Sequence, residues 1–230
     1  MFARISAFPR KIVRKIILSV LSLKNGVITF YNDEYRAEIF RLIKMIKRET
    51  EMLISYNEAY QIFMAVKGTG KIKGDIAEVG VYRGGSAKLI CEAKGERHLH
   101  LFDTFEGLPE LSENDDTAEF HKGQFSAFFE SVKNYLKKYP NVHFYRGLFP
   151  STAESVKNKK FSFVNLDVDI YESTISCLKF FYPRMSKGGI IISHDYVNSI
   201  GVRKAIDGFF KDKPEPIIVI TGLQCLIVKL

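Results

Sequence analysis

The chain has 230 residues, 46% of them hydrophobic, with 19 Phe and 11 Tyr, so it can bury the core of one domain, with or without an appendage. Its formal net charge of +8 suggests a nucleic-acid partner, but six of the 34 basic residues lie within positions 1–24, ahead of the first acidic residue, Asp33. The other 28 basic residues nearly balance the 26 acidic ones, so the body of the protein is close to neutral and no nucleic-acid partner is expected.

Residues 1–24 form a basic arm in which apolar residues recur at helical spacing between Arg and Lys. The longest apolar stretch of this arm, residues 16–23, is too short to span a bilayer, and no A-x-A-like cleavage site follows it. Two interpretations stay open. The arm is an amphipathic helix that packs on the domain or on a partner subunit, or it is an interfacial helix that makes peripheral membrane contact.

The three cysteines, Cys91, Cys177 and Cys225, form no C-x-x-C pair, and each lies in an apolar run. This usage is typical of reduced, buried thiols. We therefore expect a cytoplasmic protein, which the basic arm would allow to sit peripherally at a membrane.

Helical periodicity covers residues 33–66 and ends at a Gly/Lys-rich break, KGTGKIKGD. From there strands alternate with helices, and the chain closes with two strands joined by a short turn at Gly222. The pattern predicts a doubly wound α/β fold, Rossmann-like, whose seven-stranded sheet is mostly parallel with an antiparallel last strand. We divide the chain into a basic arm (1–24), an N-terminal helical segment (25–70) and the α/β domain (71–230). The first five strands are expected at 74–81, 97–104, 141–147, 161–169 and 188–195, and the helices between and after them at 85–93, 125–138, 172–182 and 202–211.

The first strand ends in EVGVYRGGS, residues 78–86, which is neither G-x-G-x-x-G nor a phosphate loop. Its glycines permit a tight turn, and the helix that follows directs free N–H groups at a ligand. The acid Glu78 disfavours a pyrophosphate and suits a cofactor that carries an amine, such as S-adenosylmethionine (SAM). Asp103, at the end of the second strand, is placed to accept ribose hydroxyls; the alternative is that Asp103 caps a turn, since Thr104 and Gly107 follow.

The fourth and fifth strands end in LDVD and SHDY, which brings Asp167, Asp169, His194 and Asp195 to the same sheet edge. Converging carboxylates are costly without a cation, and oxygen ligands favour Mg²⁺, with Mn²⁺ suited if His194 takes part. A metal-bound hydroxyl loses its proton easily, and a neighbouring carboxylate can act as general base. The alternatives are that Asp169 caps the next helix and that His194 is a packed core residue.

These stretches, GDIAEVGVYRGGSA, LFDTFEGLPE, RGLFPST, NLDVDIYEST, YPRMSKGGIIISHDY and GVRKAIDGF, together resemble the macrocin O-methyltransferase family, which includes mycinamicin and novobiocin sugar methyltransferases. The resemblance implies the class I methyltransferase fold and a metal- and SAM-dependent O-methyltransferase. It implies a sugar acceptor on a small natural product or a glycan. It also implies that the N-terminal helices help to close the site and to form a homo-oligomer, and the polar segment 111–122 is a candidate lid.

By the same resemblance Asp167 is a metal ligand, Asp169 the base, and Asp195 a second ligand. The family usually carries Asp-Asp-Tyr at the end of the fifth strand, so His194 is a departure that leaves the metal and its affinity open. The segment around Phe125 and the loop 147–149 are expected to frame the adenine. The full set of cofactor-binding candidates is Glu78, Gly80, Gly84, Gly85, Ser86, Asp103, Thr104, Ser126, Gly147 and Phe149.

Two other functions remain as alternatives. The first is a methyltransferase for a non-sugar acceptor such as a small diol, a protein or a nucleic acid, although no [DN]-P-P-[YFW] motif follows the fourth strand. The second is a non-catalytic SAM-binding module that binds a partner or a membrane through its arm.

Overall fold

The structure is a computed structural model that describes residues 33–230, so the basic arm predicted at 1–24 lies outside the described residues. The chain divides into two compact units, residues 1–38 and 39–230. Residues 33–38 of the first unit hold the beginning of helix α2 (Glu34–Glu49). Within the described part of the chain no helix is long and apolar enough to cross a membrane.

A seven-stranded sheet forms the centre of this unit, with the strand order β3-β2-β1-β4-β5-β7-β6. The first five strands run parallel, and β7 is antiparallel to both of its neighbours. This confirms the predicted fold class and the predicted hairpin at the end of the chain. The strands are β1 (Asp75–Val79), β2 (Leu99–Asp103), β3 (Val142–Arg146), β4 (Phe161–Leu166), β5 (Met185–Ser193), β6 (Ile218–Val219) and β7 (Cys225–Val228).

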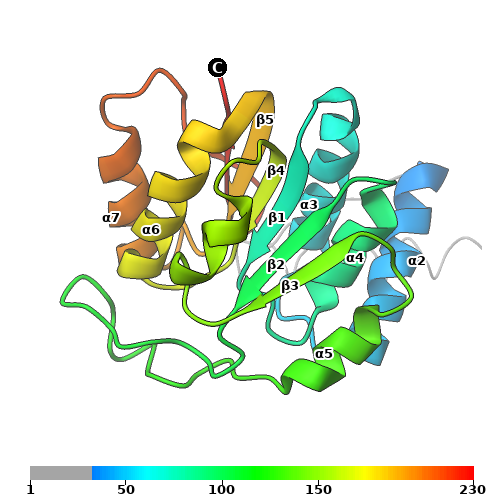
Figure 1. Cartoon of the computed structure of the whole chain (residues 1–230), viewed down its shortest axis with the longest axis horizontal. Helices are drawn as coiled ribbons and strands as arrows, with labels where there is room; N and C mark the ends of the chain where they lie inside the picture. The colour runs from blue at the N-terminus through cyan, green and yellow to red at the C-terminus, as the bar shows by residue number, and fades with distance from the viewer. Residues whose placement is uncertain (1–32) are drawn as a thin grey trace, which may run out of the picture. The chain divides into compact units, whose positions relative to one another are not determined.

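Helices cover both faces of the sheet (Figure 1). One face carries α3 (Tyr56–Gly68), α4 (Gly85–Ala93) and α5 (Phe129–Leu136), and the other carries α6 (Tyr171–Phe181) and α7 (Ile200–Phe210). Alternate residues of β1 supply the two cores, because neighbouring side chains of a strand point to opposite faces. Ile76 packs with the α3 and α4 side, whereas Ala77 and Val79 pack with the α6 and α7 side. All three cysteines are buried and free, as predicted.

Helix α3 begins with a capping box, a local sequence signal that fixes where the helix starts. The Ser55 hydroxyl accepts the Glu58 N–H, and the Glu58 carboxylate accepts the Ser55 N–H at 2.6 Å. Residues of α2 and α3, such as Ile43 and Ile62, share one core with Leu89 of α4. The N-terminal helices from residue 39 onward therefore pack into the same unit as the sheet.

A long connection, residues 104–128, joins β2 to α5 and contains the candidate lid segment 111–122. Its side chains Leu108 and Phe120 are buried against Ile170, just ahead of α6. The Asp115 carboxylate also accepts the Tyr171 N–H at 2.7 Å, in the first turn of α6. The connection is thus docked onto the α6 end of the sheet by apolar and polar contacts.

Candidate active site

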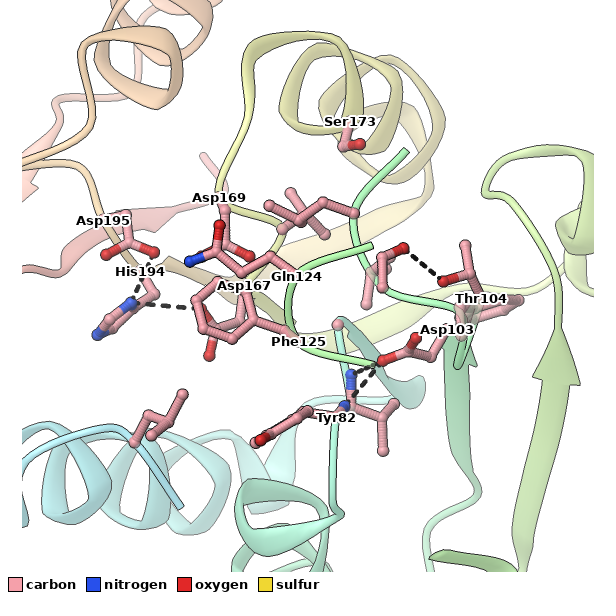
Figure 2. A pocket seen from close by; sticks show the side chains of 18 of the residues that line it. Tyr82, Asp103, Thr104, Gln124, Phe125, Asp167, Asp169, Ser173, His194 and Asp195 are labelled. Carbon is pink, nitrogen blue, oxygen red and sulfur yellow. Dashed lines mark hydrogen bonds and ion pairs between the residues drawn. The ribbon is translucent and has the colours of Figure 1, made fainter. Parts of the chain in front are cut away.

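The carboxyl ends of β1, β2, β4 and β5 surround one cavity of about 290 Å³. Backbone hydrogen bonds carry the strand register past the strand ends, because the Asp167 N–H donates to Val79 and the His194 N–H donates to Leu166. The residues that follow β1, β4 and β5 therefore lie side by side, as expected where a parallel sheet reverses its strand order. Figure 2 shows the two ends of this cavity, with Tyr82 and Asp103 at one and Asp169, His194 and Asp195 at the other.

The turn after β1 is held by a close approach of two backbones. Gly80 has a φ of 85°, and a Cβ at this position would lie 1.8 Å from the Asp167 carbonyl oxygen. Only glycine meets both demands, since it tolerates positive φ and has no side chain. Gly85 is similarly crowded, because a Cβ there would lie 2.6 Å from the Met52 side chain. Close contacts with Asp167 and Met52 therefore require glycine at positions 80 and 85 of the predicted turn.

Asp103 organises this turn through three hydrogen bonds from backbone N–H groups. One carboxylate oxygen accepts Val81 and Tyr82, at 2.6 and 2.8 Å, and the other accepts Phe105 at 2.7 Å. Burial raises the pKa of Asp103 even so, and the three bonds oppose that effect. Asp103 therefore caps this turn, which was the alternative interpretation of its place in the sequence. Asp103 also lines the cavity, where a carboxylate retains acceptor capacity for a hydroxyl.

Glu78 lies beneath the turn and not on the cavity wall. It is fully buried, accepts the Asn165 amide at 3.0 Å, and has a second oxygen with no hydrogen-bond partner among residues 33–230. Burial raises the pKa of Glu78 to about 8, and the Asn165 hydrogen bond opposes that effect. Because Glu78 does not face the cavity, its contact with a cofactor amine stays a prediction.

The other predicted cofactor positions divide into two groups. Gly84 adopts the left-handed conformation as the N-cap of α4, and neither it nor Ser126 lines the cavity. The cavity wall does contain the remaining predicted positions, which are Gly80, Gly85, Ser86, Asp103, Thr104, Gly147 and Phe149.

The far end of the cavity holds the acidic group expected from LDVD and SHDY. His194 Nδ1 lies 3.2 Å from an Asp167 oxygen and 2.9 Å from an Asp195 oxygen. Asp167, His194 and Asp195 offer ligand atoms that all lie within 4.8 Å of one another. Neither ring nitrogen of His194 has a hydrogen bond of good geometry within the described chain. Two carboxylates with a buried, unsatisfied imidazole form a donor set that fits a divalent cation.

Asp169 stands beside this group with strained backbone. Its φ of 61° and the φ of 59° at Asp195 are both left-handed, a conformation that side-chain-bearing residues seldom adopt. Ser199 fixes both residues, since its hydroxyl donates to the Asp169 carbonyl at 3.0 Å and its N–H donates to the Asp195 carbonyl at 2.8 Å. Burial and the nearby carboxylates of Asp167 and Asp195 raise the pKa of Asp169 well above its ordinary value.

Sequence reasoning missed several residues of this cavity. Residues 51–54, between α2 and α3, line it, as do Tyr82 and Gln124. Glu58 is a further omission, because its carboxylate lies 3.4 Å from His194 Nε2. The S-x-x-E pattern at Ser55 is typical of a helix cap, and nothing in the local sequence indicates that Glu58 reaches the end of β5.

The order of the strands, the antiparallel β7 and the ligand cavity at the carboxyl strand ends define the class I methyltransferase fold. A profile of the macrocin-O-methyltransferase (TylF) family matches residues 58–224. The chain belongs to that family, as the resemblance in its sequence predicted.

Curated relatives and solved structures agree with this assignment. One relative is the 8-demethyl-8-(2,3-dimethoxy-alpha-L-rhamnosyl)-tetracenomycin-C 4'-O-methyltransferase of Streptomyces olivaceus, 31% identical over 140 residues and 54% of each chain. Another is the demethyldecarbamoylnovobiocin O-methyltransferase of Streptomyces niveus, 28% identical over 60% of this chain and 58% of the relative. The chain thus spans somewhat over half the length of these relatives. The O-methyltransferase NovP superposes with a TM-score of 0.69 at 24% identity, over 78% of this chain and 82% of NovP.

Proposed function

We propose that this chain is a SAM-dependent O-methyltransferase that methylates a hydroxyl of a sugar carried by a natural product or a glycan. The observation that carries the proposal is the shared cavity, which places a glycine turn and Asp103 at one end and Asp169 at the other. The names of the relatives, which include a rhamnosyl-tetracenomycin 4'-O-methyltransferase and a novobiocin-precursor O-methyltransferase, support a sugar-containing acceptor.

SAM, when bound, would supply a methyl group on a sulfonium whose sulfur leaves as a neutral thioether. The protein must then align the acceptor oxygen with that methyl group and remove its proton. Asp169 is our proposed general base, because it faces the cavity beside the acidic cluster. Burial and the nearby carboxylates raise its pKa, which makes it a stronger base. With SAM bound, an Asp169 oxygen would take up the proton of the acceptor hydroxyl.

Asp167, Asp195 and His194 would hold a divalent cation, Mg²⁺ or Mn²⁺, at this end of the cavity. Such a cation would supply Lewis acidity that lowers the pKa of an acceptor hydroxyl. The side chains themselves keep that end of the cavity anionic and partly sheltered from water, with Phe125 and Phe120 on the cavity wall nearby.

The test of this proposal is Asp169→Asn, which removes the base while keeping the size of the side chain. We expect turnover to fall about 10²- to 10⁴-fold, with affinity for S-adenosylhomocysteine (SAH) unchanged, because Asp169 lies at the acceptor end. Methyl transfer from labelled SAM measures the first quantity, and calorimetry measures the second. Wild-type turnover in the variant would refute the role of Asp169, and absence of SAH binding in the wild type would refute the proposed function.

A further inference from the structure

Glu58 contacts His194 of the acidic cluster, although the resemblance did not assign Glu58 to the site. It lies at the beginning of α3, far from β5 in the sequence, and its side chain is 4% exposed. Its Oε1 accepts the Leu223 N–H at 2.7 Å and lies 3.4 Å from His194 Nε2. Its Oε2 accepts the Ser55 N–H at 2.6 Å. Both oxygens are therefore fixed by backbone of two different elements.

The Glu58 carboxylate packs closely against the backbone of Gly222. Gly222, in the turn before β7, has a φ of 86°, and a Cβ there would lie 2.3 Å from Glu58 Oε1. A carboxylate held by these contacts thus faces Nε2 of His194.

Glu58 and the two aspartates face opposite ring nitrogens of His194, although none of these contacts is a hydrogen bond of good geometry. A neutral imidazole has one N–H and one lone pair, and its hydrogen bond determines which nitrogen carries the proton. With the proton on Nε2 and directed at Glu58, the lone pair lies on Nδ1. Nδ1 is the atom that lies 3.2 and 2.9 Å from the Asp167 and Asp195 carboxylates. A lone pair facing two carboxylates is repulsive, so this tautomer requires a cation among them; without a cation, a proton on Nδ1 would take that place.

A carboxylate that accepts the second ring N–H is the usual outer partner of a metal-binding histidine. The inner donor set here is one imidazole nitrogen and two carboxylates. Imidazole suits first-row transition metals, whereas Mg²⁺ favours sites made only of oxygen. Within residues 33–230 this is the one group of three or more such side chains close enough to hold an ion.

We propose that Glu58 is a positioning residue that presents Nδ1 of His194 to a mixed nitrogen and oxygen site, and that this site selects a first-row transition metal such as Mn²⁺ over Mg²⁺. The inference rests on the proposed function for the location of the metal, but it concerns binding and not turnover. Glu58 therefore has two roles. Its carboxylate caps α3, and it also orients the His194 side chain just after β5.

The test uses the metal-free full chain, with Mn²⁺ as the probe followed by electron paramagnetic resonance. Mg²⁺ is the diamagnetic competitor, and its affinity is obtained from its displacement of bound Mn²⁺. Nitrogen modulation in the spin echo of bound Mn²⁺ reports a coordinated imidazole. We expect that modulation in the wild type, with Mn²⁺ bound more tightly than Mg²⁺. His194→Asp should abolish the modulation and lower the ratio of Mn²⁺ to Mg²⁺ affinity, because it converts the site to oxygen ligands.

Glu58→Gln should weaken Mn²⁺ binding about 10- to 100-fold, the usual effect of removing an outer partner, and should weaken the nitrogen modulation. The matched control is Glu49→Gln, which removes a carboxylate that bonds Lys88 and Tyr135 and does not line the cavity; its Mn²⁺ binding should equal that of the wild type. If Glu58→Gln fails to fold, as a purely structural cap would allow, His194→Asp alone decides the metal preference.

Several outcomes would overturn the inference. Bound Mn²⁺ without nitrogen modulation would show that His194 is not a ligand, and an unchanged affinity ratio in His194→Asp would show that it does not set the preference. SAH binding without any metal binding would reject the metal site while leaving the methyltransferase proposal intact. Metal binding with nitrogen modulation but without SAH binding would support the metal site and reject the methyltransferase proposal.

Discussion

At the residue scale, Gly80 connects the glycine-rich turn after β1 to the acidic end of the cavity. Because Gly80 has no side chain, the turn after β1 lies in contact with the Asp167 carbonyl oxygen. Gly80 therefore sets the distance between this turn and the acidic residues that follow β4. The glycine was predictable from the sequence as a turn residue. Its contact with Asp167 was not predictable, because the two residues are brought together only by the pairing of β1 with β4.

Gly80→Ala should therefore lower the free energy of unfolding by about 1–3 kcal/mol, the usual cost of overpacking, and should also weaken SAH binding. Gly70→Ala is the matched control, because a Cβ at Gly70 would meet nothing within 4 Å. Urea unfolding and calorimetry with SAH measure the two quantities. Equal effects of the two substitutions would contradict the close approach at Gly80.

At the element scale, the connection between β2 and α5 depends on Asp115 for its attachment to α6. Helix α6 has no side-chain cap of its own at Ile170, and the Asp115 carboxylate supplies one from the connection. The same carboxylate accepts both the N–H and the hydroxyl of Ser112. A carboxylate at a helix N-terminus is favourable for both hydrogen bonding and the helix dipole.

Asp115→Ala should cost about 0.5–2 kcal/mol of stability and should make residues 104–128 more sensitive to limited proteolysis. Asp116→Ala is the control, since the Asp116 side chain accepts only the Ala118 N–H within the same connection. A protease digest followed by mass spectrometry locates the cuts. Equal cleavage in the two variants would show that Asp115 does not anchor the connection.

The elements themselves were largely readable from periodicity, since strands, helices and the final hairpin fall close to the predicted ranges. Helix α5 is shorter than expected, because Phe125 has a positive φ of 62° and the helix begins only at Phe129. The acidic cluster was predictable because the ends of parallel strands meet at one sheet edge. Glu58 was not, since its contact with His194 depends on how α3 packs beside the β6–β7 turn.

At the scale of the whole molecule, every residue assigned to the site lies between positions 51 and 195. The basic arm at 1–24 contributes six positive charges, and its helical pattern is the only support for peripheral membrane contact. We therefore expect the cavity to keep its ligand-binding properties when the arm is removed.

Deleting residues 1–24 should leave SAH affinity unchanged and should abolish co-sedimentation with anionic vesicles, if the arm is an interfacial helix. Calorimetry and vesicle sedimentation measure the two effects. Unchanged sedimentation would favour the alternative, in which the arm packs on the domain or on a partner subunit, and reduced SAH affinity would show that the arm also supports the site.

The central claim is that one cavity joins a SAM site to a general base. A crystal structure of the chain with SAH tests it most directly. We predict SAH density against Gly80, Ser86 and Thr104, with its sulfur facing Asp169. SAH bound elsewhere, or bound in this cavity with its sulfur turned away from Asp169, would contradict the claim.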